Sequence, residues 1–411
     1  MEGALQGHIA AVERWEPQVQ ALVDWSEASA VEREAIAPTG PLAGWALGIK
    51  DIIDVAGLPT HCGVDFLDER PKPHSAPIVS QLESLGAYVL AKVVTTVFAY
   101  FDPGPTRNPW NLEHTPGGSS MGSAAAVACG MVRGALGTQT IGSVGRPAAY
   151  CGVVGFKPSY PRVSQAGVFL FSPSVDTVGF FTRNTADMAT LVNALFQTKD
   201  QPSPRTLAPP RVGLVQDLHC ETAAPDMLVA LDTLATRLAD SGWSVDRDAR
   251  LADSLRDAYE NHHRIVAGEV YREHEDLFAA HRQHYTPKLT ELILRGQQVT
   301  DDELAERLQK KQVLTDTLDS HFDRWDVLIT PGAPSAAPRG LAVTGDPRMS
   351  LLSTHTGIPA LTIPMARNAQ GLPLGVQLLA RSGADLDLLQ QARAIESIVR
   401  FDATPPAPTI S

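Results

Sequence analysis

The spacing of hydrophobic residues along the first hundred positions alternates between helical and strand-like. Apolar side chains at helical spacing over 9–24 predict an amphipathic surface helix. Prolines at 38–41 break the chain, and 46–50 is then a short apolar strand that ends on a lysine. Residues 78–85 again have helical spacing, and 88–93 has the pattern of a strand. Helices and strands that alternate in this way indicate an α/β fold.

A long helical stretch interrupts the strand signals of the second half. Residues 251–295 are mainly polar with helical spacing, and a capping box from Thr300 to Glu303 predicts that a long helix starts there. One α/β body with an inserted helical segment explains this order better than two independent domains, with the proline-rich segment 201–210 as the best candidate boundary. Further strands are expected at 212–215, 327–330, 361–364 and 376–379, and further helices at 123–131, 225–242 and 385–399.

Composition narrows the classes of protein to which this chain can belong. Its 411 residues include 46 acidic and 34 basic side chains, a net charge of −12, so a nucleic-acid partner is not expected. No apolar run reaches 18 residues and the first residues lack the pattern of a secretion signal, so we expect neither a transmembrane helix nor export. Four cysteines have no disulfide or zinc spacing and are expected to be buried thiols in a reducing cytoplasm: Cys62, Cys129, Cys151 and Cys220.

Lys50 is the first residue with a chemistry of its own. It closes the apolar strand 46–50 and is followed by Asp51 and Asp54. A buried lysine loses hydration, which lowers its pKa and lets the neutral amine act as a general base. The residues alone leave a second interpretation open, in which a surface lysine pairs with one of the two aspartates.

A segment rich in glycine and serine follows at 115–123. Its glycines let the backbone approach a ligand closely, but it lacks the Lys-Ser/Thr ending of a phosphate-binding loop. Residues 118–122, Gly-Ser-Ser-Met-Gly, also satisfy G-x-S-x-G, the nucleophile turn of α/β-hydrolases, with Ser120 as nucleophile. That turn normally follows an apolar strand, whereas prolines precede this one. A simple turn that caps the next helix is the other interpretation.

A third segment, 137–147, places Ser143 behind a turn of small residues, Gly-Thr-Gln-Thr-Ile-Gly-Ser-Val-Gly-Arg-Pro. Such a turn can expose the serine hydroxyl and direct backbone N–H groups to one point, which the oxyanion of acyl transfer requires. Taken alone, the segment fits an ordinary tight turn better.

Together the three segments resemble the signatures of the amidase-signature family. The first matches its G-[VI]-K-D motif and the second its G-G-S-S-x-G-S motif. The third matches G-T-x-T-x-G-S-[VI]-x-R-P and continues into C-G-[VI]-x-G-[FL]-K-P. The 24-residue step from Ser119 to Ser143 also fits the family, and the resemblance runs from about residue 5 to 398.

The resemblance implies a fold and a reaction. The fold would be α/β, a single large domain over 1–411 whose mixed sheet has helices on both faces. Within it, the signature core would span 64–200, and a mainly helical variable region at 211–325 would border the active-site funnel. The reaction would be hydrolysis of an amide, carbamate or urea-like C–N acyl bond through an acyl-enzyme.

The resemblance also implies roles for single residues. Ser143 would be the nucleophile, Ser119 the proton relay, preceded by a cis peptide bond, and Lys50 the base. No metal or organic cofactor is required. The expected partner is a small-molecule amide or carbamate, without nucleic acid or membrane, and a homodimer stays open. The oxyanion donors would be the backbone N–H groups of Ile141, Gly142 and Ser143, with Thr140 at the edge, and Gly117 and Gly118 would contact the substrate.

Around Ser143, three residues depart from the commonest family pattern, and Val97, Met121 and Pro161 depart from it elsewhere. Gln139 stands where aspartate is frequent, and Arg146 comes one place later than usual. Ile141 stands where a glycine usually precedes Gly142. Because a β-branched residue resists positive φ and fills space, Ile141 predicts either an ordinary loop conformation or a reshaped acyl pocket.

Two polar groups outside these motifs need an interpretation. Five histidines lie between 262 and 284, and His281 and His284 can share one helix face, so a metal site is conceivable. A polar helix that covers the body is the simpler interpretation. Asp176 and Arg183 are expected to form a structural ion pair near the core.

Other functions stay open on the sequence alone. The chain can be an A-type component of an amidotransferase that works with partner proteins and tRNA, although its acidic charge argues against this. An esterase of the α/β-hydrolase type would instead use Ser120. A binding protein without catalysis is disfavoured, because Lys50, Ser119 and Ser143 are all intact.

Overall fold

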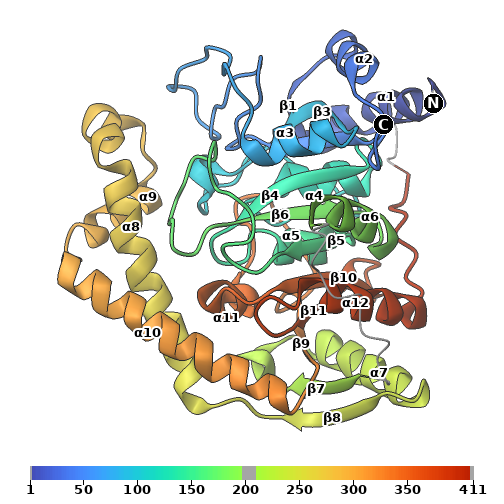
Figure 1. Ribbon diagram of the computed structural model, residues 1–411, viewed down its shortest axis with the longest axis vertical. Coiled ribbons are helices and arrows are strands. Elements are labelled where there is room, and N and C mark those ends of the chain that lie inside the picture. Colours follow the sequence, from blue (N-terminus) through green and yellow to red (C-terminus); the bar gives the residue numbers. More distant parts are fainter. Residues whose placement is uncertain (1, 197–209, 408–411) are drawn as a thin grey trace.

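One continuous mixed sheet of 11 strands forms the centre of the molecule (Figure 1). The computed structural model describes residues 2–196 and 210–407. Along the sheet the strand order is β1-β3-β2-β4-β6-β5-β10-β11-β9-β7-β8. Strand β2 runs parallel to β3 and β4, and β7 runs parallel to β8 and β9, while the other neighbours are antiparallel. A single large α/β domain with a mixed sheet is therefore confirmed.

The strands are β1 (Leu22–Trp25), β2 (Ala46–Lys50), β3 (Tyr88–Val93), β4 (Gly134–Gln139), β5 (Val154–Lys157), β6 (Thr177–Thr182), β7 (Arg211–Val215), β8 (Ser244–Ala249), β9 (Val327–Pro331), β10 (Ala360–Arg367) and β11 (Pro373–Leu379). The α-helices are α1 (Glu2–Val19), α2 (Glu27–Ile36), α3 (Pro77–Ser84), α4 (Met121–Ala128), α5 (Gly145–Cys151), α6 (Thr185–Phe196), α7 (Pro225–Asp240), α8 (Asp257–His281), α9 (Pro287–Gly296), α10 (Asp301–Ser320), α11 (Arg348–Thr356) and α12 (Asp385–Val399). In the described part of the chain, the longer helices are all too polar to cross a membrane.

Helix α4 packs unusually close to the sheet because its residues are small. All eight of its side chains, in the sequence MGSAAAVA, are buried. A Cβ atom added to Gly122 would lie 2.4 Å from the backbone of both Ala21 and Val94. The run of small residues therefore forms the tightly packed helix that the sequence predicts, and its N-terminus directly follows Ser119 and Ser120.

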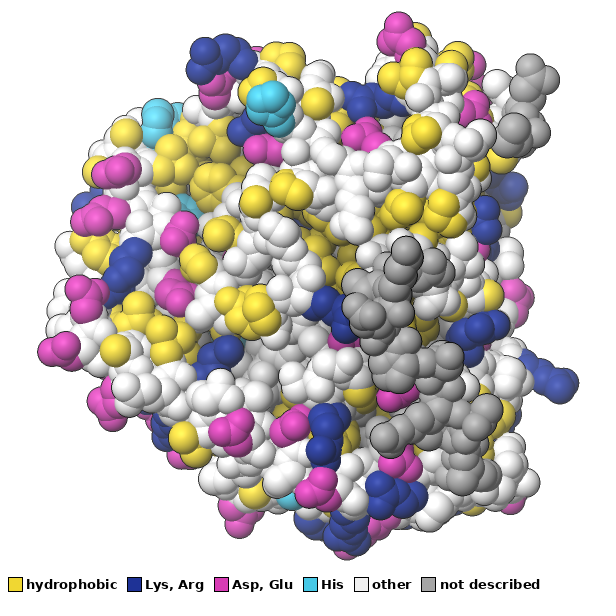
Figure 2. Space-filling model, viewed as in Figure 1, with side chains coloured by type: hydrophobic (Ala, Val, Ile, Leu, Met, Phe, Trp, Pro, Cys, Tyr) yellow, Lys and Arg dark blue, Asp and Glu magenta, His cyan; other side chains and the backbone are white. Residues whose placement is uncertain are grey.

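Helices α8, α9 and α10 form an arm along one side of the body (Figure 1). The predicted start of α10 is confirmed, because the Thr300 hydroxyl accepts a hydrogen bond from the Glu303 N–H at 3.1 Å. The Glu303 carboxylate accepts from Arg264, so the reciprocal half of a capping box is not formed. At the upper end of the arm, Phe66 from the body packs against His281 and His284. Hydrophobic side chains gather on the surface in this upper left region of the view (Figure 2).

Several predicted boundaries differ from the structure. The helix predicted for 9–24 ends at Val19, because Gln20 has a φ of 54° and Leu22 pairs with Val93 as part of a strand. Within the mainly helical region 211–325, the strand expected at 212–215 is β7, and β8 at the sheet edge was not predicted. All but the last residue of the candidate boundary 201–210 lies outside the described residues.

Candidate active site

Lys50 is the last residue of β2, a fully buried strand that lies third from the β1 edge of the sheet. Its side chain is 0% exposed, and its Nζ donates to Ser119 Oγ and to Thr138 Oγ1, each at 2.7 Å. Burial lowers the pKa of Lys50 to about 7, and more distant negative charge on Asp176 opposes this only partly. An amine in this state accepts a proton readily near neutral pH.

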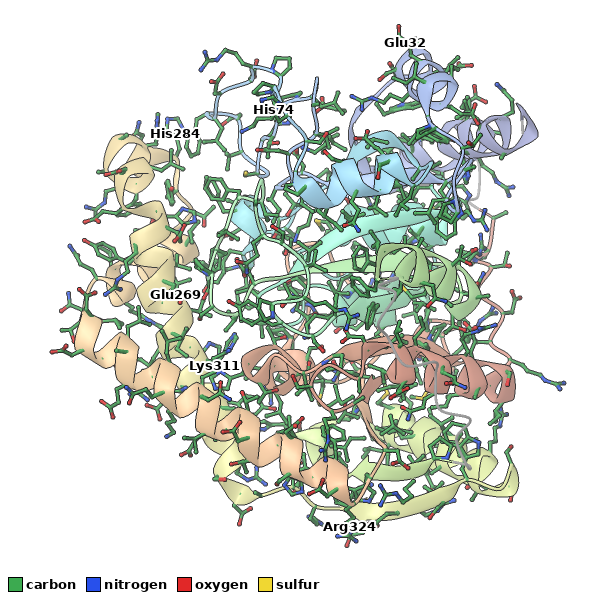
Figure 3. All side chains as sticks on the ribbon, in the orientation of Figure 1. Glu32, His74, Glu269, His284, Lys311 and Arg324 are labelled. Atoms are coloured by element: carbon green, nitrogen blue, oxygen red, sulfur yellow. The ribbon has the colours of Figure 1, made fainter. Side chains whose placement is uncertain are left out.

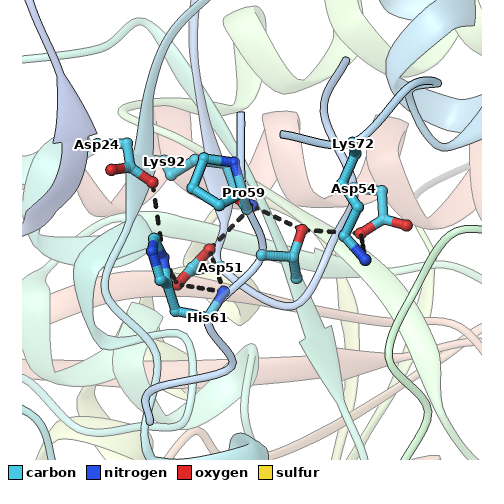
Figure 4. A network of polar contacts seen from close by, with 8 residues as sticks. Asp24, Asp51, Asp54, Pro59, His61, Lys72 and Lys92 are labelled. Atoms are coloured by element: carbon cyan, nitrogen blue, oxygen red, sulfur yellow. Dashed lines mark hydrogen bonds and ion pairs between the residues drawn. The ribbon is translucent and has the colours of Figure 1, made fainter. Parts of the chain in front are cut away.

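A second buried lysine, Lys92 on the neighbouring strand β3, has a different partner (Figure 4). Its Nζ lies 2.9 Å from Asp51 Oδ1 and also donates to the Pro59 carbonyl oxygen at 3.0 Å. Asp51 is thus the counter-ion of Lys92, and Asp54 pairs with Lys72 at 3.4 Å. The alternative in which Lys50 is a surface lysine paired with an aspartate is therefore wrong.

Burial alone does not distinguish Lys50. Lys157 on β5 is also fully buried, and burial lowers its pKa to about 7 as well. Its Nζ donates to the carbonyl oxygens of Pro158 and Ile358, which cannot relay a proton. What sets Lys50 apart is a serine hydroxyl at 2.7 Å that can both accept and donate.

Ser119 and Ser120 are adjacent but have different surroundings. The Gly118–Ser119 peptide bond is cis, and Ser119 Oγ meets Lys50. Ser120 is 0% exposed, and its Oγ exchanges hydrogen bonds with the N–H and the carbonyl of Thr138, both at 3.2 Å. This hydroxyl is enclosed and bound to backbone, which argues against the alternative with Ser120 as nucleophile.

Ser143 lies just before α5 and lines a narrow pocket. Two residues into α5, the buried Arg146 donates to the Gly118 carbonyl oxygen through Nε at 3.2 Å and through Nη2 at 2.6 Å. This arginine therefore joins the Ser143 segment to the peptide that precedes Ser119. In the described contacts, no hydrogen bond joins the two serine hydroxyls directly. The cavity is lined by Ala99, Tyr100, Phe101, Thr140, Ile141, Gly142, Ser143, Arg146, Phe171 and Pro347.

The turn before Ser143 is shaped by close packing. Ile141 has no positive φ and is 8% exposed at the cavity wall, so its loop conformation is ordinary, as one of the two interpretations expected. A Cβ on Gly142 would lie 3.0 Å from the carbonyl oxygen of Pro347, which explains glycine at this position. Gly117 has a φ of 84°, and a Cβ on Gly118 would lie 2.8 Å from Thr344, so both belong to the turn around Ser119.

Asp176 belongs to this site, and sequence reasoning missed it. Its Oδ1 accepts from the Thr140 hydroxyl at 2.5 Å, and its Oδ2 accepts from the N–H groups of Phe171 and Ser172 at 2.7 and 2.9 Å. Burial raises the pKa of Asp176 to about 6 despite these bonds. The predicted ion pair with Arg183 is wrong, because Arg183 binds the carbonyl oxygen of Ala403.

The histidine-rich stretch does not form a group of metal ligands among the described residues. His262 and His274 are buried, while His281 and His284 contact Phe66 on the outside. The ligand atoms that do approach one another belong to Asp24, Asp51 and His61, within 4.8 Å (Figure 4). Lys92 already compensates the Asp51 charge there at 2.9 Å.

The fold is that of amidase-signature enzymes, and its sheet carries the lysine–serine pair at the end of β2. A family model described as Amidase matches residues 8–389, and the chain belongs to this family.

Proteins similar to this chain include both amidases and amidotransferase components. The A-type component of the glutamyl-tRNA(Gln) amidotransferase of Moorella thermoacetica is 30% identical over 88% of this chain and 84% of its own length. A crystal structure titled as an amidase has a TM-score of 0.86 at 28% identity, covering 96% of this chain and 95% of that one. The peptide amidase of Stenotrophomonas maltophilia has a TM-score of 0.84 at 25% identity, covering 99% and 95%.

Proposed function

We propose that this chain hydrolyses a carboxylic amide or a related C–N acyl bond, with Ser143 as nucleophile, Ser119 as proton relay and Lys50 as base. The observation that carries the proposal is the buried contact of 2.7 Å between Lys50 Nζ and Ser119 Oγ. A lysine whose pKa is lowered to about 7 is largely neutral at slightly alkaline pH, where it can take a proton.

In the first half of the reaction, Ser143 Oγ attacks the carbonyl carbon. Its proton moves to Ser119 Oγ while the Ser119 proton moves to Lys50 Nζ, which becomes an ammonium. The tetrahedral intermediate collapses as the C–N bond breaks, and Lys50 returns its proton through Ser119 to the leaving nitrogen. In the second half, water repeats the attack on the acyl-enzyme and Ser143 is released with the acid product.

The backbone before Ser143 supports an oxyanion site. In the described part of the chain, the N–H groups of Ile141, Gly142 and Ser143 donate to no protein acceptor, whereas those of Val144 and Gly145 do. Free N–H groups beside the nucleophile can stabilise the developing oxyanion. Thr140 is held at the edge of this site by Asp176.

A test is hydrolysis by the purified chain of a panel of an aryl amide, a primary aliphatic amide, a carbamate and a urea-like compound. We expect turnover of at least one compound without added metal or partner, and loss of that turnover in Ser143→Ala. Turnover that survives in Ser143→Ala would overturn the assignment of the nucleophile.

The second candidate is an A-type amidotransferase component, and the similarity to the corresponding component of the glutamyl-tRNA(Gln) amidotransferase favours it. Such a protein would use the same three residues but would act together with partner proteins. The same panel distinguishes the two functions. Turnover by the isolated chain supports the free-standing hydrolase, and turnover that appears only with partner proteins supports the amidotransferase.

A further inference from the structure

Gln139 is the last residue of β4, and its side chain is buried beneath the turn that carries Ser143. Its Oε1 accepts two hydrogen bonds, from the N–H of Val144 at 2.8 Å and from the N–H of Gly145 at 3.0 Å. These are the two peptide groups that directly follow Ser143. The amide oxygen of Gln139 therefore fixes the chain on the C-terminal side of the nucleophile.

The NH2 group of the Gln139 side chain is linked to the chain on the N-terminal side of Ser143 through a residue of α11. Gln139 Nε2 donates to Thr354 Oγ1 at 2.9 Å, and Thr354 Oγ1 donates to the carbonyl oxygen of Ile141 at 2.7 Å. Thr354 is 1% exposed. One amide and one hydroxyl thus hold the peptides on both sides of Ser143.

The pattern of donors and acceptors requires a glutamine at position 139. Thr354 has a single hydroxyl hydrogen, which is directed to the carbonyl of Ile141 or, at 3.1 Å, to that of Ser350, so its oxygen must accept from residue 139. Residue 139 must therefore donate once and accept twice. A carboxylate in its place accepts but cannot donate, and it would leave the buried Thr354 oxygen facing a second acceptor.

We propose that Gln139 and Thr354 are positioning residues, which hold Ser143 and the N–H groups of Ile141 and Gly142 in the geometry of the transition state. The inference rests on the proposed role of Ser143. Because Gln139 occupies the N–H groups of Val144 and Gly145, the three N–H groups before them are the ones left for the substrate oxyanion. Neither side chain lines the cavity, so substrate binding does not depend on direct contact with them.

The test compares Gln139→Glu, Thr354→Val and Thr354→Ser with the parent chain. We expect kcat to fall by about 100-fold in Gln139→Glu and in Thr354→Val, with KM within about threefold, because the oxyanion donors act mainly in the transition state. Thr354→Ser keeps the hydroxyl, so its kcat should stay within about threefold of that of the parent chain.

Thr356→Val is the matched control. Thr356 lies on the same helix, is buried, and its hydroxyl donates to Leu352 within α11, away from the turn. Its kcat should stay at the parent value while its loss of thermal stability resembles that of Thr354→Val. Equal kcat in Thr354→Val and Thr356→Val would overturn the inference.

Labelling by a serine-reactive phosphonate separates this inference from the proposed function. If the parent chain is labelled at Ser143 and Gln139→Glu and Thr354→Val are labelled at the parent rate, only the positioning roles fail. If Ser143 of the parent chain is not labelled, the proposed function itself fails. If Gln139→Glu does not fold, the Thr354→Val and Thr354→Ser pair decides alone.

Discussion

At the scale of single residues, neighbours decide what a buried lysine does. Lys92 lies against a carboxylate at 2.9 Å, Lys157 against two carbonyl oxygens, and Lys50 against two hydroxyls. Carboxylates and carbonyls hold an ammonium in place, whereas a serine hydroxyl can pass a proton on. Of these three lysines, Lys50 is the one whose amine meets a serine hydroxyl, at 2.7 Å.

Lys50→Met should remove activity and yet stabilise the fold at low pH. The ordinary lysine pKa is 10.5 and the folded value is about 7, so the unfolded chain binds an extra proton between these values and the free energy of unfolding rises with pH there. Below pH 7, the burial of Lys50 destabilises the folded chain by about 5 kcal/mol. The hydrogen bonds from Lys50 to Ser119 and Thr138 offset part of this. We expect a gain of about 1–3 kcal/mol at pH 6 that shrinks toward pH 10, measured by urea unfolding. A variant less stable than the parent chain at pH 6 would contradict a neutral, buried Lys50.

The same lowered pKa sets the pH dependence of acylation. In the proposed mechanism neutral Lys50 is the active form, so kcat/KM should rise about tenfold per pH unit below pH 7 and level off above it. Asp176, whose pKa is raised to about 6, should steepen the fall below pH 6 if its charge holds Thr140. Stopped-flow acylation with an aryl amide measures the profile, and a flat profile between pH 5.5 and 8 would exclude Lys50 as the base.

Ser119→Ala and Ser120→Ala form a matched pair of adjacent substitutions. Ser119→Ala removes the proposed relay between Lys50 and Ser143, and kcat should fall by at least about 1,000-fold. Ser120→Ala removes two buried hydrogen bonds to Thr138, so it should cost about 1–3 kcal/mol of stability with kcat nearly unchanged. Steady-state kinetics and thermal melts of both variants check this, and the reverse pattern would return the nucleophile to Ser120.

At the scale of helices and strands, the sequence predicts those elements that carry a local signal. Helix α10 begins directly after the predicted cap residue Thr300, and α12 spans the predicted 385–399. Strands β4 and β6 were missed because glycine and threonine hide their periodicity. What makes them regular is pairing over long distances, such as that of Gly137 on β4 with Gly179 on β6.

Gly122→Ala and Gly7→Ala should have opposite effects on stability, although both lie in helices. A Cβ on Gly122 would meet the backbone oxygen of Ala21 and the nitrogen of Val94 at 2.4 Å, which α4 can relieve only by moving away from the sheet. We expect a loss of about 3 kcal/mol or more, together with lost activity because Ser119 precedes α4. Gly7 in α1 has nothing within 4 Å, so alanine should add about 1 kcal/mol. Thermal melts of both variants measure the contrast, and similar effects would contradict the close packing of α4.

At the scale of the whole molecule, the sheet brings together residues that are distant in the chain. Lys50, Ser119 and Ser143 were predicted from motifs, and the structure places Lys50 directly on Ser119. Asp176 and Thr354 were not predicted as site residues. Asp176 contacts Thr140, 36 positions away in the chain, and Thr354 contacts Gln139 and Ile141, 215 and 213 positions away. A local sequence pattern does not reveal contacts between such distant positions. Single-sequence reasoning therefore proposes the reacting groups, whereas the residues that hold them become visible only in the fold.

The helical arm is connected to the site through a loop of the body. Glu269 on α8 accepts hydrogen bonds from the Ser172 hydroxyl at 2.5 Å and from the Ser174 N–H at 3.1 Å, and Figure 3 shows it on the side of α8 that faces the body. The neighbouring Phe171 lines the cavity of Ser143. This contact is consistent with the expectation that 211–325 borders the active-site funnel, which remains a prediction.

The most direct test of the central claim is the site at which a serine-reactive phosphonate labels the purified chain. We predict one adduct by intact mass, located by peptide mass spectrometry on Ser143, with labelling that slows strongly in Lys50→Met and Ser119→Ala. An adduct on Ser120, or labelling of Ser143 at the parent rate in both variants, would contradict the proposed relay from Ser143 through Ser119 to Lys50.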